Sequence, residues 1–127
     1  MKKVWIALFL LCSLHMMSAE IDWSSPPEAL STVGQSGTNP QIAMDANGNV
    51  VAVWIEGGLV KSKSKLVGME WSSIPITLSG MGSSSPQVVS DLNGNATAIW
   101  VENGLIKASS KTLAGNWTNP VILSGSN

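Results

Sequence analysis

Hydrophobic residues occur in short runs separated by turn residues along most of this chain. Residues 50–55 (Val-Val-Ala-Val-Trp-Ile) are apolar at every position, whereas residues 59–64 mix apolar and polar positions. Short runs between Gly, Asn and Asp residues predict strands, and a fully apolar run predicts a strand covered on both faces. We therefore expect strands over 41–45, 50–55 and 59–64, followed by a fourth from Trp71 to about Leu78.

The pattern from Pro40 to Trp71 returns after 46 residues without a gap. The matching pairs include Asp45 and Asp91, Gly48 and Gly94, Trp54 and Trp100, Glu56 and Glu102, and Trp71 and Trp117. A fixed period of about 20 to 50 residues indicates a solenoid, a propeller or another array. A small β-sandwich shares the turn spacing but does not explain the period.

We predict an all-β fold of β-propeller-like repeats, with two four-stranded antiparallel blades plus one extra N-terminal strand. The fourth-strand pattern occurs three times, beginning at Trp23, Trp71 and Trp117, whereas the other strands occur twice. The predicted organisation is therefore an extra strand and loop over 20–39, blade repeat 1 over 40–79 and blade repeat 2 over 80–127. The extra strand, at 23–31, could complete a neighbouring blade.

Turn chemistry supports the division into hairpins. Asn47-Gly48 and its copy at 93–94 are typical of type I′ turns, which need positive φ at both central positions. Gly57-Gly58 and Asn103-Gly104 predict the next turn in each repeat. Pro40 and Pro86 precede the first strands, a position that suits the start of a strand. Gly48, Gly94 and the tryptophans Trp54, Trp71, Trp100 and Trp117 are accordingly expected to be structural.

Residues 1–19 have the features of a secretory signal peptide. Two lysines precede an apolar core over 4–14, and Met17-Ser18-Ala19 is a plausible cleavage site. An uncleaved anchor, or a lipoprotein modified at Cys12, are the alternatives. We expect a secreted or periplasmic protein of bacterial type, without a membrane segment after signal removal.

The chain after residue 19 excludes several classes of function. It has no Cys, His, Arg or Tyr, and five lysines stand against eight acids. A nucleic-acid partner would need a basic face, so none is expected. The lack of His, Cys, Arg and Tyr leaves few groups for acid–base or nucleophilic catalysis, and we expect no enzyme activity and no cofactor.

The turn before the fourth strand resembles the Asp-box of sialidase-like propellers, whose pattern is S-x-D-x-G-x-T-W. Ser64, Gly68 and Trp71 match, whereas Leu66 stands in place of the Asp; the second copy keeps Ser110 and Trp117. The resemblance implies blade-like turns. The sialidase active site uses three Arg and a Tyr, which the chain after residue 19 lacks, so the resemblance does not carry over catalysis.

Glu56, Glu102 and Asn103 are the candidate ligand-binding residues. In an up-and-down blade, the second strand ends on the same face as the loop that enters the first strand. These residues should therefore lie beside the Gly-, Ser- and Thr-rich loops 32–39 and 80–85. A solvated acid beside a turn is the alternative, and paired carboxylates that hydrolyse glycosides are another.

Two further patterns have competing interpretations. Asp45, Asn47 and Asn49 resemble part of a calcium loop, but Val50 stands where such a loop needs Gly, and hairpin chemistry explains the same residues, so no metal is expected. The four tryptophans could stack on sugars, but large aromatics in apolar strands are typical of a core.

The sequence favours a non-enzymatic, propeller-type binding module. The expected ligand is a glycan or another cell-surface polymer, and an intact chain would form homo-oligomers, closing a ring between copies. The alternative is a truncated fragment of a longer propeller protein, such as a sialidase-like enzyme or an adhesin, which is inactive by itself.

Overall fold

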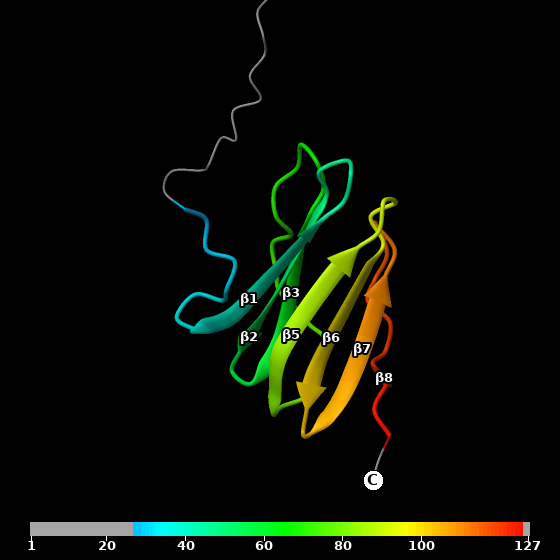
Figure 1. Ribbon diagram of the computed structural model, residues 1–127. Coiled ribbons are helices and arrows are strands. Elements are labelled where there is room, and N and C mark those ends of the chain that lie inside the picture. Colours follow the sequence, from blue (N-terminus) through cyan, green and yellow to red (C-terminus); the bar gives the residue numbers. More distant parts are fainter. Residues whose placement is uncertain (1–26, 126–127) are drawn as a thin grey trace, which may run out of the picture.

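The computed structural model describes residues 27–125, which form two four-stranded antiparallel sheets side by side (Figure 1). The strands are β1 (Gly37–Met44), β2 (Val50–Glu56), β3 (Leu59–Lys65), β4 (Ile76–Thr77), β5 (Ser83–Ser90), β6 (Ala96–Glu102), β7 (Leu105–Lys111) and β8 (Val121–Ile122). Each sheet follows chain order, β1-β2-β3-β4 and β5-β6-β7-β8. The prediction of an all-β fold with two four-stranded repeats is confirmed. The expected signal peptide and Trp23 lie outside the described residues.

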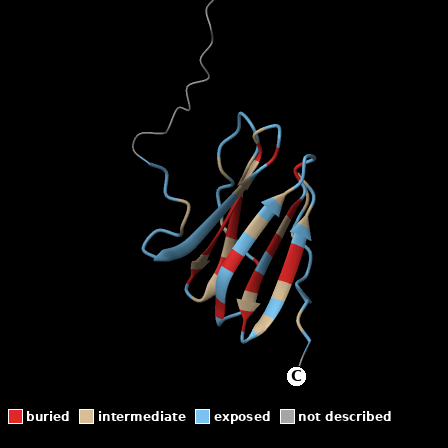
Figure 2. Cartoon of the chain, in the orientation of Figure 1, coloured by how far each residue is buried: buried red, intermediate tan, exposed pale blue. Residues whose placement is uncertain are grey.

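The second strand of each sheet is the most deeply covered, as its apolar sequence predicts. In β2, residues 51–54 are all buried, whereas β1 is exposed at nearly every position (Figure 2). A strand in the middle of a sheet with neighbours on both faces needs apolar side chains in both directions. We call the first sheet with its turns blade 1, and the second blade 2.

The prolines lie inside the first strands and not at their beginnings, which corrects the prediction. The pairing of β1 with β2 shifts between Thr38 and Gln41, and Asn39 in this bulge has a φ of 51°. In blade 2 the same shift lies beside Pro86, after Ser85 with a φ of 50°. A bulge leaves its residues outside the regular ladder, so proline costs no hydrogen bond there.

The two kinds of hairpin turn differ from each other. Gly57 and Gly58 both have positive φ, as do Asn103 and Gly104, and these two-residue turns have the sign pattern of type I′. The predicted type I′ turn at 47–48 is wrong. Of those two residues Gly48 alone has positive φ, and its N–H donates to the carbonyl of Asp45 over 3.3 Å. The loop 46–48 is a three-residue hairpin loop, which needs one left-handed residue and not two.

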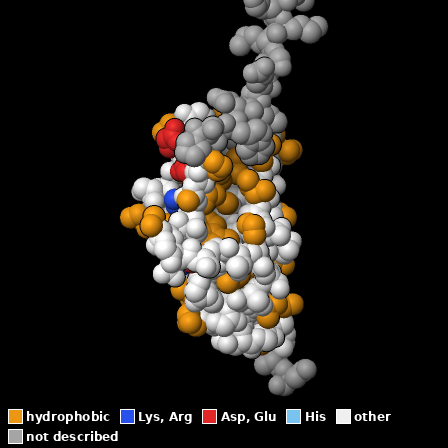
Figure 3. Space-filling view, turned by 90° about the vertical axis from the view of Figure 1, so that its left-hand side faces the viewer, with side chains coloured by type: hydrophobic (Ala, Val, Ile, Leu, Met, Phe, Trp, Pro, Cys, Tyr) orange, Lys and Arg blue, Asp and Glu red, His pale blue; other side chains and the backbone are white. Residues whose placement is uncertain are grey.

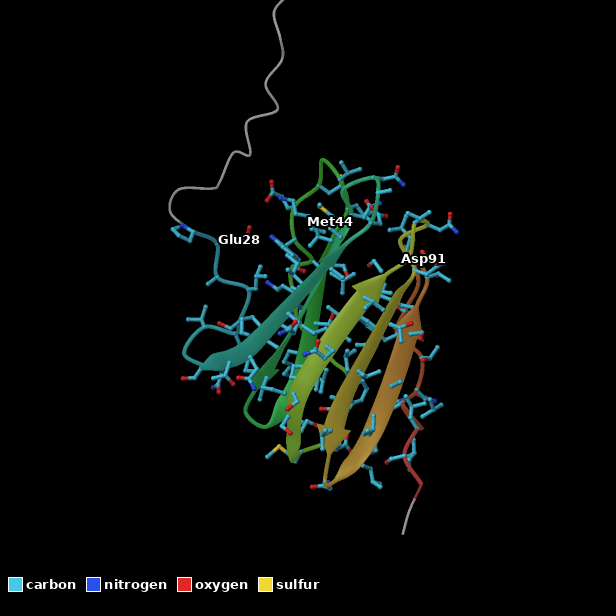
Figure 4. The ribbon with its side chains drawn as sticks, viewed as in Figure 1. Glu28, Met44 and Asp91 are labelled. Carbon is cyan, nitrogen blue, oxygen red and sulfur yellow. The ribbon has the colours of Figure 1, made fainter. Side chains whose placement is uncertain are left out.

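The fourth strands are shorter than the sequence predicts. β4 contains two residues, and Trp71 contributes an isolated bridge to Lys65. Within the segment expected to form the extra strand, residues 27–31 are not in a strand. Glu28, which belongs to this segment, lies on the side of blade 1 away from blade 2 (Figure 4).

The core lies between the two blades. Val53 and Val60 of blade 1 cluster with Ala98 and Trp100 of blade 2, and Leu78 after β4 completes the group. All five side chains are at most 6% exposed. Strand β5 contacts β1, β2 and β3. Blade 2 therefore packs on one face of blade 1, mainly through β5. No helix among the described residues is long and apolar enough to cross a membrane.

Candidate functional site

Glu56 ends β2 and is buried, with 4% of its surface exposed. Its Oε2 accepts a hydrogen bond from the indole Nε1 of Trp54 over 3.1 Å and another from the N–H of Thr32 over 3.0 Å. Residues two apart on a strand point to the same face, which brings the indole to the carboxylate. Glu56 therefore connects the centre of blade 1 to the segment that precedes β1.

Glu102 repeats this arrangement in blade 2. Its Oε2 accepts from the indole of Trp100 over 3.1 Å and from the N–H of Gly80 over 3.0 Å. Its Oε1 also forms an ion pair with Lys107 at 2.6 Å. Gly80 lies between β4 and β5, so this carboxylate anchors the connection between the two blades.

These hydrogen bonds keep both carboxylates ionised. The Lys107 ammonium lowers the pKa of Glu102, and bonds from Trp100 and Gly80 add to this against the opposing effect of burial. Burial acts to raise the pKa of Glu56, but hydrogen bonds from Thr32 and Trp54 outweigh it, and the pKa lies below its ordinary value. A paired-carboxylate hydrolase needs one protonated acid at working pH, so this ionisation disfavours that chemistry.

Asn103 lies where the turn after β6 meets the connection between the blades. Its Nδ2 donates to the carbonyl of Met81 over 3.3 Å, and its N–H donates to the carbonyl of Gly82. The N–H of Ser83 bonds to Gly58 of the blade 1 turn. The structure therefore brings the predicted residues beside the expected loops. Because Glu56 and Glu102 are buried, Asn103 is the one of the three with an exposed side chain.

Asp45 and Asp91 use their carboxylates within their own turns. Oδ1 of Asp45 accepts from the N–H groups of Asn47 and Asn49, each at 2.9 Å, and Oδ2 accepts from the Asn49 amide at 2.7 Å. The hydrogen bond from the Asn49 side chain lowers the pKa of Asp45 against the effect of burial. Within residues 27–125, no group of three or more His, Cys, Asp or Glu side chains gathers to hold a metal.

The tryptophans divide by position. Trp54 and Trp100 are 5% and 1% exposed, and Trp117 packs against the core between the blades. Trp71 is partly buried. These contacts place the indoles of Trp54 and Trp100 inside the fold, where their rings have little face left for a sugar.

An open groove lies beside blade 1, on the face away from blade 2. It encloses about 530 Å³. Its polar lining includes Ser31, Thr32, Lys61, Lys63 and Ser73, with Val33, Ile74 and Pro75 among the apolar residues. Hydroxyl and ammonium groups beside short apolar surfaces are suited to a ligand that carries both hydroxyl groups and negative charge.

Lys63 is the most distinctive residue of this groove. It is 8% exposed, whereas the repeat places Ser109 at the same point of blade 2. The Nζ of Lys61 donates to Thr77 over 2.6 Å, but no described residue accepts a hydrogen bond or forms an ion pair with Lys63. Lys63 lines the groove, where its ammonium is available to an anionic ligand.

Sequence reasoning missed this groove. The segment 29–33 and the loop 73–75 are far apart in the chain, and their approach follows from the packing of the segment before β1 across the face of blade 1. The sequence signal that could have indicated the groove is the difference between Lys63 in blade 1 and Ser109 at the equivalent position of blade 2. Equivalent core positions of two repeats usually keep similar chemistry. Comparisons of the chain with protein-family models, with curated proteins and with solved structures found no match.

Proposed function

We propose that this protein is a secreted or periplasmic, non-enzymatic binding module built from β-propeller-type repeats, and that its ligand is an acidic carbohydrate. The observation that carries the proposal is the groove with Lys63 in its wall, at a position where blade 2 has Ser109. Hydroxyl groups of Thr32 and Ser73 offer donors and acceptors to sugar hydroxyls, and the ammonium offers a partner for a carboxylate.

The proposed binding is shallow, and its strength depends on repetition. The groove is open along its length, so a single site leaves much of a sugar in contact with water. Several sugar units on one polymer would raise the effective concentration and thus the avidity. This favours a polymer at a cell surface over a free monosaccharide.

A glycan array of acidic and neutral oligosaccharides tests the proposal, followed by calorimetry on the best acidic hit. Lys63→Met keeps the length of the side chain and removes its charge, and should weaken binding by roughly tenfold or more. Lys65→Met, on the same strand but outside the groove, is the matched control and should bind like the wild type. Equal binding by the Lys63 variant, or no preference for acidic glycans, would contradict the proposal.

A further inference from the structure

Among the described residues, each blade has one outward face with no neighbouring blade against it. Each of these two faces repeats a face that is packed between the blades. On β2, Val53 points toward blade 2, so its neighbours Ala52 and Trp54 point away. Forty-six residues later, Ala98 and Trp100 form the face that blade 2 turns toward blade 1. The outward face of blade 1 is therefore a second copy of the face that blade 2 uses for packing.

The outward face of blade 2 repeats the packing face of blade 1 in the same way. Val53 and Val60 are 0% exposed, whereas their equivalents Ile99 and Ile106 are 39% and 42% exposed. Leu78 is 6% exposed and the corresponding Leu123 is 59% exposed. The residues that form the core on blade 1 are thus left bare on blade 2.

The outward face of blade 1 has a hollow where that bare face would fit. It encloses about 260 Å³ and is lined by Leu30, Gly37, Ala52 and Trp54 among others. The equivalent residues Leu78, Ala98 and Trp100 cluster around Val53 and Val60 in the interior. Viewed from the side of blade 1, hydrophobic side chains gather near the middle of the surface (Figure 3).

We infer that the outward face of blade 2 binds blade 1 of a second copy of this chain, in the way that blade 1 binds blade 2 within the chain. Ile99 and Ile106 of one copy then fill the hollow beside Trp54 of the next. The two faces differ, so the interface is head-to-tail, and repetition leads either to a closed ring or to an open filament. This inference does not rest on the proposed ligand.

Repeat geometry brings two segments to the same place at such a junction. After β4, Leu78 packs in the core, Ser79 Oγ accepts from the N–H of Val60, and Gly80 bonds to Glu102. Within the chain, Leu30 and Thr32 already hold the equivalent positions on blade 1, with Thr32 bonded to Glu56. In the assembly, Leu123 and Ser124 of the copy that contributes blade 2 would occupy the same positions.

We expect the segment 28–32 of the copy that contributes blade 1 to take this space. Strand β8 of the copy that contributes blade 2 is then displaced. The Thr32–Glu56 bond exists before association, whereas Val121 and Ile122 of β8 are 57% and 58% exposed and lose little apolar burial on release. Residues 28–29 then pair with β7 of the neighbour, and the Ser31 hydroxyl replaces Ser124 as acceptor for the N–H of Ile106. The extra strand of the sequence pattern thereby becomes the fourth strand of another copy.

Light scattering coupled to size exclusion tests the docking of a second copy. The purified protein should have the mass of a discrete number of copies, or a distribution that grows with concentration if the ring stays open. Ile106→Lys should reduce the mass to that of one chain and leave the circular dichroism spectrum unchanged, because this side chain is already partly exposed. Leu92→Lys, which lies in a turn at 76% exposure, is the control and should assemble normally.

A wild-type protein that stays monomeric at every concentration would overturn the docking, and the bare face would then suit a following blade of a longer chain. The strand exchange has its own test. A variant that ends at Asn119 should still assemble, whereas Ser31→Ala should assemble more weakly than Ser124→Ala. Loss of assembly on truncation, with full assembly of Ser31→Ala, would overturn the exchange.

Discussion

The backbone N–H of Thr32 donates a hydrogen bond to Oε2 of Glu56 over 3.0 Å, although Thr32 precedes the first strand and Glu56 ends the second. The same contact joins Gly80 to Glu102 in the other blade. A carboxylate at the end of each central strand thus fastens the segment that enters the blade. This is a structural use of the two acids that the sequence suggested for ligand binding.

The two glutamates should contribute unequally to stability. Glu102→Gln removes the charge that pairs with Lys107 as well as the charge-assisted bonds from Trp100 and Gly80, whereas Glu56 has no ion pair among the described residues. We expect Glu102→Gln to lower the free energy of unfolding by about 2–3 kcal/mol and Glu56→Gln by about 1 kcal/mol. Urea denaturation measures both. Glu28→Gln, at an exposed position, should change nothing, and a reversed order of the two glutamates would contradict this account.

Stability should fall in acid because the folded state lowers the pKa of Glu56, Glu102, Asp45 and Asp91. A carboxyl with a lowered folded pKa stabilises fully above its unfolded pKa, about 4 for these residues, and this contribution disappears as the pH falls through the folded value. The urea midpoint should therefore be flat near neutral pH and drop below about pH 4. In the Glu102→Gln variant, the urea midpoint should fall less steeply with decreasing pH. An equally steep fall would show that this carboxyl does not contribute to the acid sensitivity.

Gly94→Ala should destabilise the protein more than Gly48→Ala. Both glycines have positive φ, which costs about 1 kcal/mol for alanine. A Cβ on Gly94 would also lie 2.6 Å from Oδ2 of Asp45 and 2.7 Å from Cδ1 of Leu113, whereas a Cβ on Gly48 would meet Val67 at an ordinary 3.6 Å. Thermal unfolding of the two variants side by side gives the comparison. Equal losses of stability would mean that Asp45 and Leu113 move away from the added Cβ at little cost.

Ser62→Ala should leave stability unchanged or raise it by about 0.5–1 kcal/mol. Ser62 is 1% exposed, and its Oγ has no hydrogen-bond partner among the described residues. The repeat has Ala108 at this position of blade 2, so the backbone accepts alanine there. Removing a buried hydroxyl that makes no bond removes its desolvation cost. Chemical denaturation decides, with Ser109→Ala as the control that breaks a 2.7 Å bond to Thr118 and should destabilise.

Asn103→Gly should keep the stability within about 0.5 kcal/mol of the wild type. Asn103 has a φ of 51°, and blade 1 has Gly57 at the equivalent position of the same turn. Glycine adopts this conformation without strain, which offsets the lost bond from the amide to Met81. Unfolding and glycan binding should be measured on the same preparation. A stable variant with weakened binding would show that the exposed amide contacts ligand, as the sequence suggested.

The sequence by itself determined the repeat, the order of strands and the positions of most turns. A 46-residue period, alternating side-chain directions and residues such as Gly57-Gly58 act over a few neighbours, so local patterns are sufficient to predict them. The turn at 46–48 was predicted wrongly because Asn-Gly is compatible with both a two-residue and a three-residue hairpin loop. The Asp45 carboxylate, which accepts hydrogen bonds from two backbone N–H groups, favours the three-residue loop.

The tertiary structure alone decided what the chemically interesting residues do. Glu56 and Thr32 are 24 residues apart, and their bond depends on how the entering segment crosses the blade. The same packing brings Ser31 and Lys63 to one groove and leaves Ile99 and Ile106 bare while their equivalents are buried. Equivalent positions of the two repeats have different surroundings because one face lies between the blades and the other has no neighbouring blade. Burial depends on neighbours, which the repeat itself does not encode.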